Sequence, residues 1–358
     1  MNFKRISFYL SFFCFPVSFL SFINILYASY FDYFLSIETY FITLAFSLLL
    51  GLCLFYFGKK SPKNINFIEQ LILIICAYIL SSVLISIPFY LSNYQVTFVN
   101  SLFESISGLT GTGFSIFKDI KYLDPTLILW RSSSQWLGGL FFLSFLLIIF
   151  SNKSFNYKMT NLTYSGDNNF ISESNVKDNL LRIFIIYSLL SVLILSLLNL
   201  SGVRLFNSLN LSMTLVSGGG FLPIESITKI ISTNFQKIIL IFSFIVSFLN
   251  FYLLFNIFNK NILIKDHKED FYLILLTIIF CCLIYFNKYD GLDIIISVTS
   301  SLSNSGLTLM KSDNNLSLYF LLITIIGGSL ISNSSGIKLT RLYILLKITS
   351  LEIIKLIS

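Results

Sequence analysis

The chain carries the stretch NSLFESISGLTGTGF at residues 100–114 and a near copy of it, NSLNLSMTLVSGGGF, at residues 207–221. The two stretches align without a gap and are identical at seven positions. A third stretch, DIIISVTSSLSNSGL at residues 293–307, keeps a hydroxyl residue three positions before its last glycine and a large apolar residue after that glycine. Repetition within one chain indicates a structural unit that occurs three times.

Each stretch lies between two long apolar runs, and it is too apolar for an ordinary loop and too short for a helix that crosses a membrane. A short helix followed by a Ser/Thr–Gly segment cannot expose its backbone to lipid, so it must be enclosed by protein and line a polar path. Glycine lets the backbone run along an axis, where successive carbonyls can replace the water around a dehydrated cation. The alternative is that these glycines only allow close helix packing.

The composition is that of a membrane protein. The 358 residues are 55% hydrophobic and only 11% charged, and the mean hydropathy is +0.83. Soluble domains carry about 25% charged residues and disordered chains are still more polar, so both classes are excluded. The net charge of +7 lies in short segments between apolar runs, which favours cytoplasmic lysines of a membrane protein over nucleic-acid binding. We therefore predict an all-α polytopic membrane protein in which short helix–loop units lie between the spans.

Eight apolar runs are long enough for transmembrane helices, which need about 20 residues each. They are residues 7–29, 38–57, 67–91, 126–150, 179–201, 235–259, 270–287 and 317–349. The first run is too long for a signal peptide and has no clear cleavage site, so we expect a retained helix. Most Lys and Arg residues then fall on the side of the N-terminus, which predicts that both termini are cytoplasmic.

Three polar or aromatic residues at the outer start of the fourth run are expected to lie at the membrane interface. Trp130 and Trp136 are the only tryptophans and are expected to act as interface anchors. Arg131 is expected to snorkel toward water rather than to line an ion path. Glu104 is the only acidic residue of the first repeated stretch, and we expect it to orient its helix through hydrogen bonds; the alternative is that it attracts cations.

The last apolar run is too long for one span. A helix over residues 317–349 would be about 50 Å long, whereas the bilayer core is about 30 Å thick. Its middle, GGSLISNSSGIK at residues 327–338, is polar and rich in residues that weaken helices. We expect a break inside the membrane, buried in protein or facing water. The alternative is a cytoplasmic helix joined to a shorter span.

Residue types needed for catalysis are scarce, so we expect neither enzymatic activity nor a cofactor. The single histidine, His267, lies in a charged segment, and the five cysteines lie in apolar runs without metal-type spacing. A membrane enzyme would need clustered acidic residues, and the two acidic groupings are expected on opposite sides of the membrane. These groupings are Asp290/Asp293 and Asp266/Glu269/Asp270.

Several motifs, taken in chain order, resemble one family. They are residues 86–89 (SIPF), 103–108 (FESISG), 110–113 (TGTG), 130–132 (WRS), 135–139 (QWLGG), 217–221 (SGGGF), 327–329 (GGS) and 336–338 (GIK), followed by Arg341. Together they resemble the Trk/Ktr/HKT superfamily of potassium transporters, and most of all the bacterial Trk-type potassium uptake membrane subunit.

The resemblance implies a function and a set of site residues. It implies potassium uptake through a carbonyl-lined filter, with potassium held near Thr110, Gly113, Gly220 and Gly306. The implied filter residues are Thr110, Gly111, Thr112, Gly113, Ser217, Gly218, Gly219, Gly220, Ser303, Asn304, Ser305 and Gly306. The break at residues 327–338 would be the family's intramembrane loop, which obstructs the pathway until the transporter opens. Its implied gate residues are Gly327, Gly328, Ser329, Asn333, Ser335, Gly336 and Lys338.

The resemblance also implies an organisation. The implied parts are two N-terminal transmembrane helices (1–65), pore repeat 1 (66–151), a cytoplasmic loop (152–178), pore repeat 2 (179–260) and pore repeat 3 (270–350). The implied setting is the bacterial inner membrane, and the implied partners are a second copy of the chain and a cytosolic nucleotide-binding regulatory ring.

Two departures from the family pattern keep alternatives open. The family has four pore repeats, whereas three are found here. Another polypeptide or a symmetry mate would supply the fourth, or the chain would be a truncated, non-conducting or regulatory relative. Ile331, Ser334 and Ser335 also stand where the family usually has glycine, and Asn304–Ser305 replaces paired hydroxyl residues. A pathway permeable to both sodium and potassium is a further alternative.

Overall fold

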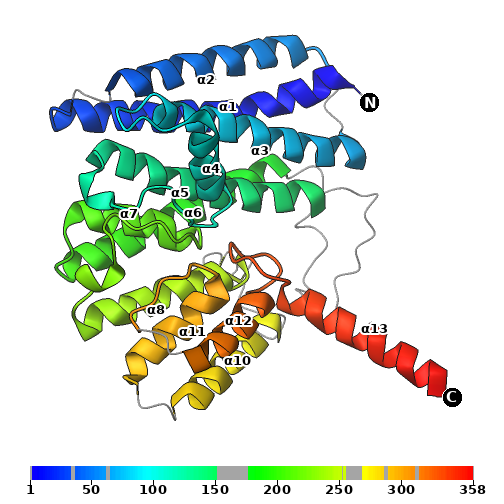
Figure 1. Ribbon diagram of the computed structural model, residues 1–358. Helices are drawn as coiled ribbons and strands as arrows, with labels where there is room; N and C mark the ends of the chain where they lie inside the picture. Colours follow the sequence, from blue (N-terminus) through cyan, green and yellow to red (C-terminus); the bar gives the residue numbers. More distant parts are fainter. Residues whose placement is uncertain are drawn as a thin grey trace.

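The computed structural model describes residues 2–33, 37–61, 65–150, 176–251, 253–254, 268–285, 289–310 and 314–357. Within these residues the chain is helical and has no strand (Figure 1). The described helices are α1 (Phe3–Tyr30), α2 (Ile37–Gly58), α3 (Phe67–Tyr90), α4 (Phe98–Leu109), α5 (Pro125–Phe150), α6 (Val176–Leu200), α7 (Leu205–Val216), α8 (Asn234–Phe248), α10 (Lys268–Tyr285), α11 (Gly291–Ser303), α12 (Asn314–Ile326) and α13 (Leu339–Ile357), with short 3₁₀ helices at Ile120–Tyr122 and Ile227–Lys229. The predicted all-α membrane fold is confirmed, while most of the predicted loop 152–178 lies outside the described residues.

Five of the described helices, α1, α2, α3, α5 and α6, are long and apolar enough to cross a membrane. Of the other three predicted spans, 270–287 corresponds to α10, whereas 235–259 and 317–349 are not single helices. In particular, the prediction of one helix over 235–259 is wrong, because α8 ends at Phe248 and Leu249 is extended. The predicted break in the last run is confirmed: α12 ends at Ile326 and α13 begins at Leu339.

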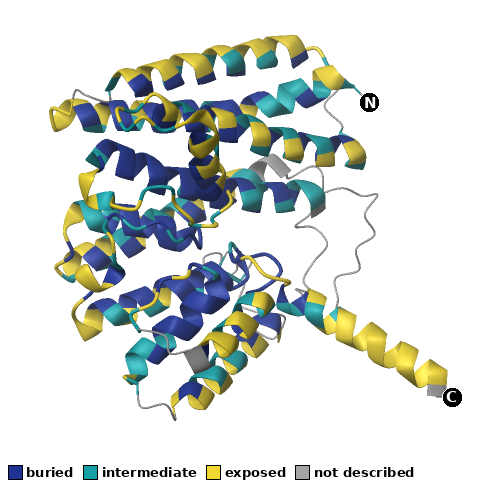
Figure 2. Cartoon of the chain, in the orientation of Figure 1, coloured by how far each residue is buried: buried dark blue, intermediate teal, exposed yellow. Residues whose placement is uncertain are grey.

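The burial pattern of α2 is that of a helix facing lipid. Its buried residues include Thr43, Ser47 and Gly51, whereas Phe41 and Leu49 are exposed. Small and hydroxyl side chains let membrane helices approach closely, and apolar side chains face the hydrocarbon. The outermost helix of Figure 2 is accordingly exposed on one side along its length.

The helices form two adjoining groups with the short helices between the long ones. Figure 1 shows α1–α3 side by side, with α5, α6 and α7 beside them and α8, α10, α11 and α12 gathered at the other end. The short helices α4, α7 and α11 begin at equivalent places of the three repeated stretches, residues 98, 205 and 291. The last helix, α13, extends away from the body, and most of its length is exposed (Figure 2).

Candidate functional site

The three repeated stretches have the same backbone structure after their short helices. In each loop, a backbone N–H donates to the carbonyl five residues earlier: Thr112 to Ser107 at 3.0 Å, Gly219 to Thr214 at 2.8 Å, and Ser305 to Ser300 at 3.1 Å. The donors are equivalent positions of the aligned stretches, and so are the acceptors. We call residues 110–113, 217–220 and 303–306 the first, second and third pore loops.

A left-handed residue at one equivalent position explains the shared turn. Gly111 and Gly218 have φ of 70° and 69°, and Asn304 has φ of 61°. Asparagine tolerates this conformation better than other residues that carry a β-carbon. The substitution of Asn304 for glycine therefore leaves the third pore loop with the geometry of the other two.

The three pore loops lie against one another with the second in the middle. A β-carbon placed on Gly113 would come within 2.9 Å of Gly220 Cα, and one on Gly220 within 2.5 Å of the Ser305 carbonyl oxygen. One on Gly218 would lie 3.4 Å from the carbonyl oxygen of Ser303. No described glycine of the first loop closely approaches the third loop, and none of the third closely approaches the first. Thr110 and Thr112 on the first loop and Gly306 on the third are exposed.

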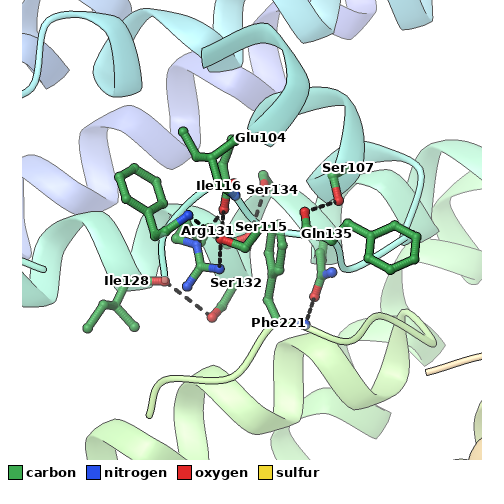
Figure 3. Close-up of polar contacts among 12 residues, drawn as sticks. Glu104, Ser107, Ser115, Ile116, Ile128, Arg131, Ser132, Ser134, Gln135 and Phe221 are labelled. Atoms are coloured by element: carbon green, nitrogen blue, oxygen red, sulfur yellow. Dashed lines mark hydrogen bonds and ion pairs between the residues drawn. The ribbon is translucent and has the colours of Figure 1, made fainter. Parts of the chain in front are cut away.

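A buried ion pair supports the segment that follows the first pore loop (Figure 3). Arg131 Nε donates to Glu104 Oε1 at 2.8 Å, and both residues are at most 1% exposed. The other carboxylate oxygen of Glu104 accepts from the backbone N–H of Ile116 at 2.9 Å. Arg131 Nη2 donates to Ser115 Oγ at 3.0 Å, and Ser115 Oγ donates to Glu104 Oε1 at 3.0 Å. These contacts agree with the expected structural role of Glu104, in which its hydrogen bonds orient the short helix α4.

The predicted interface roles of Arg131 and Trp130, both on α5, are wrong. Arg131 is 1% exposed and does not snorkel, because Glu104 on α4 provides a buried counter-ion. Trp130 is also 1% exposed, and its Nε1 donates to the carbonyl of Ile85 in α3 at 3.0 Å. Trp136 Nε1 donates to Ser191 Oγ in α6 at 2.8 Å. All three side chains join α5 to other helices, and the interface role of the partly buried Trp136 stays a prediction.

The same helix supports the second pore loop. Gln135 Oε1 accepts from the backbone N–H of Phe221 at 3.2 Å, and a β-carbon on Gly219 would collide with the Gln135 side chain at 2.4 Å. The ring of Phe221 stacks with the Arg131 guanidinium, whose central carbon lies 4.3 Å from the ring centroid. Arg131 and Gln135, one helical turn apart on α5, therefore fix the backbone that follows both loops (Figure 3).

The intramembrane loop, residues 327–338, is bound to three helices. The N–H of Ser329 donates to the carbonyl of Phe248 at 2.9 Å, where α8 ends. Glu269 Oε1, on α10, accepts from the N–H of Leu330 at 3.1 Å and from Thr340 Oγ1 at 2.9 Å. Asn333 Nδ2 donates to the carbonyl of Val216 at 2.9 Å, where α7 leads into the second pore loop.

The predicted gate residues differ in their placement within this loop. Gly327 and Gly336 meet where the loop closes, since a β-carbon on Gly336 would lie 2.8 Å from Gly327 Cα. Ser335 and Gly336 are exposed. Four of the predicted gate residues are buried inside the protein: Gly327, Gly328, Ser329 and Lys338.

A cavity of about 230 Å³ is lined by residues of the first and second pore loops and of the intramembrane loop. Thr110, Gly111 and Ser217 line one part of it, and Asn333 and Lys338 line another. Among the described residues, no group of His, Cys, Asp and Glu side chains could hold a metal ion.

The chain is similar to transport proteins of bacteria and archaea. It is 26% identical over 309 residues to an uncharacterized cation transporter of Methanocaldococcus jannaschii, and 27% identical over 340 residues to the Trk system potassium uptake protein TrkG of Escherichia coli. The crystal structure of the potassium transporter TrkH from Vibrio parahaemolyticus has the same fold, with a TM-score of 0.82 over 100% of this chain at 18% identity. The chain is a homologue of the Trk potassium uptake proteins. No family model matches it.

The Trk homologue spans part of the length of these relatives. The matched region is 83% of this chain and 62% of the archaeal transporter, and 89% of this chain and 69% of the Escherichia coli protein. It covers 77% of the Vibrio chain. By their names these relatives are transport proteins.

Sequence reasoning missed several supporting residues of the Trk homologue. The sequence predicts an interface position for Arg131 and no supporting role for Glu269, although both are at most 1% exposed. Gln135 was part of the family motif but had no assigned role. The available signal was a polar side chain near an apolar run, and such residues are costly to bury unless they are partnered.

Proposed function

We propose that this Trk homologue takes up potassium through a pathway formed by its three pore loops. The observation that carries the proposal is the shared backbone geometry of the loops together with their close approach at Gly113, Gly220 and Ser305. Glycine-rich loops present backbone carbonyls, which can replace the hydration shell of potassium. Potassium would be held near Thr110, Gly113, Gly220 and Gly306. The membrane potential would drive uptake with about 2.3 kcal/mol per charge per 100 mV.

The intramembrane loop would be the gate of this pathway. Its support is the contact between Asn333 and the Val216 carbonyl, which joins the loop to the segment that leads into the second pore loop. The cavity of about 230 Å³ is lined by residues of both, so an ion that leaves the pore loops would next meet residues 327–338.

The setting of the protein follows from its charge bias and its relatives. We propose an inner-membrane location with both termini in the cytoplasm, because most basic residues then lie on the cytoplasmic side. A homodimer regulated by a cytosolic nucleotide-binding ring is the assembly that the family resemblance implies. The ring would dock on the basic cytoplasmic face.

A second candidate function is that of a relative that conducts only when another polypeptide segment completes the ring of loops. The observation in its favour is that no described glycine of the first pore loop closely approaches the third pore loop, or the reverse. Thr112 on the first pore loop and Gly306 on the third are both exposed. Without such a segment, the protein would be a non-conducting or regulatory membrane component.

The test is rubidium uptake, with potassium and sodium as competitors, into liposomes that contain the purified chain. Gly113→Val should abolish uptake, because Gly113 has φ of 80° and faces Gly220 at contact distance. Gly202→Val is the matched control, since Gly202 has φ of 92° but no atom lies within 4 Å of its β-carbon position. Uptake that persists in Gly113→Val would contradict the proposed pathway. Folded wild-type protein without uptake would favour the second candidate function.

A further inference from the structure

Lys338, the last residue of the intramembrane loop, is held in an unfavourable backbone conformation. Its φ is 76°, a region in which long side chains are seldom found, and the residue is 5% exposed. Residues remain in such conformations only when the surrounding contacts fix them. The contacts of its side chain therefore bear on why the loop keeps this shape.

The ammonium group of Lys338 lies in a shell of neutral oxygens. Nζ donates to the Ser332 carbonyl at 3.2 Å, to Ser332 Oγ at 3.1 Å and to Ser334 Oγ at 3.1 Å, and it also contacts the Ser334 carbonyl. No ion pair joins it to a carboxylate in the part of the chain that the structure describes. Such a shell of carbonyl and hydroxyl oxygens is the kind that a dehydrated monovalent cation requires.

The turn that holds this ammonium group also carries the contact with the pore loops. Ser332 Oγ and Ser334 Oγ lie 2.8 Å apart, and Ser334 Oγ accepts from the N–H of Gly328 at 3.0 Å. Asn333 lies between the two serines, and its amide donates to the Val216 carbonyl. Its own carbonyl oxygen lies 3.3 Å from the β-carbon position of Gly218 in the second pore loop. Lys338 thus stabilises the turn that presses against this pore loop.

We propose that Lys338 is a tethered cation that latches the intramembrane loop against the second pore loop, and that ion flux requires its ammonium group to leave the oxygen shell of Ser332 and Ser334. The charge of the lysine, rather than its bulk, holds the turn. The proposal deepens the proposed function and rests on it, because it assigns a regulatory element to the same pathway.

The first test measures release of the loop without measuring flux. Ser329, which lies in the loop and is buried, is replaced by cysteine in a background whose five native cysteines are serine. Lys338→Met, which keeps the length but removes the charge, should raise the rate of thiol labelling roughly tenfold, the effect expected from losing hydrogen bonds to a charged group. Ser332→Ala, a milder change that removes one oxygen of the shell, should raise the rate less. An unchanged labelling rate in both variants would overturn the latch.

The second test separates the latch from the pathway. Rubidium uptake should rise in Lys338→Met liposomes and should be lost again when Gly113→Val is added. If labelling rises and uptake through Lys338→Met is insensitive to Gly113→Val, the latch stands but the proposed ion pathway is wrong. If uptake is blocked by Gly113→Val but neither uptake nor labelling responds to Lys338→Met, the pathway stands and the latch is overturned.

Discussion

The ion pair between Arg131 and Glu104 is the residue-scale contact on which the end of the first pore loop depends. It joins α5 to the pore helix α4, and through Ser115 and Ile116 to the chain that leaves the loop. Both charges are buried, so each is stable only while the other is present. The pair therefore couples the position of the pore helix to that of the loop.

Removing one partner of this pair should be more damaging than removing both. Arg131→Met leaves the Glu104 carboxylate buried without a counter-ion, and we expect a loss of about 3–5 kcal/mol in the free energy of unfolding. The double variant Arg131→Met/Glu104→Gln should recover much of this loss. Thermal unfolding in detergent measures both values. Equal destabilisation of the single and double variants would contradict the coupling.

Asn304 provides a second residue-scale prediction. Asparagine suits this position because it tolerates a left-handed backbone, and not because of a contact of its side chain. Its φ is 61°, and its buried amide nitrogen has no hydrogen-bond partner within the described residues. Asn304→Gly should therefore keep stability and uptake. Asn304→Val should lose about 1–2 kcal/mol, since a β-branched residue is strained in the left-handed region. The melting temperatures of the two variants measure this difference in stability. Equal melting temperatures would show that the backbone conformation of residue 304 does not matter for stability.

At the scale of elements, Glu269 fixes both ends of the intramembrane loop to α10. Its Oε1 accepts from the N–H of Leu330 at one end and from the N–H and hydroxyl of Thr340 just beyond the other. The extended segment after α8 is bound to the same first turn of α10, since the N–H of Asn250 donates to Asp270 Oδ1 at 2.8 Å. Two acidic residues at the start of α10 thus hold two non-helical segments.

Replacing Glu269 should therefore destabilise the intramembrane loop. Glu269→Ala leaves three buried donors without an acceptor, and we expect a loss of at least about 2 kcal/mol in the free energy of unfolding. Glu269→Gln keeps one acceptor oxygen and should cost less. Hydrogen exchange of the Leu330 and Thr340 amides, together with the melting temperature, measures the effect. Unchanged exchange in Glu269→Ala would mean that α10 does not hold the loop.

The elements that could be predicted from the sequence are those that leave a periodic or repeated pattern. The three pore loops were found because equivalent glycines and hydroxyl residues recur, and the break at 327–338 because a polar stretch interrupts an overlong apolar run. The end of α8 at Phe248 was missed, because residues 235–259 remain mostly apolar across it. The break is stabilised by distant groups, such as the pairing of the Phe251 N–H with the Ile331 carbonyl at 2.7 Å. Long-range partners such as Arg131 and Glu104 likewise leave no pattern along the chain.

On the scale of the whole molecule, the charge bias predicts which segments face the cytoplasm. Lys121, after the first pore loop, and Lys59, after α2, are both exposed and lie on opposite sides in the predicted topology. In a cysteine-free background, a membrane-impermeant thiol reagent added to cells should label Lys121→Cys directly. It should label Lys59→Cys only after permeabilisation. The reverse pattern would invert the proposed orientation and place the intramembrane loop on the outer side.

The most direct test of the account is to locate the transported ion itself. Crystals of the protein grown with rubidium in place of potassium would give anomalous density wherever a potassium site exists. We expect density between the pore loops, beside Gly113, Gly220 and Gly306. Density confined to other parts of the molecule, with the pore loops folded and empty, would contradict the claim that these three loops form the ion pathway.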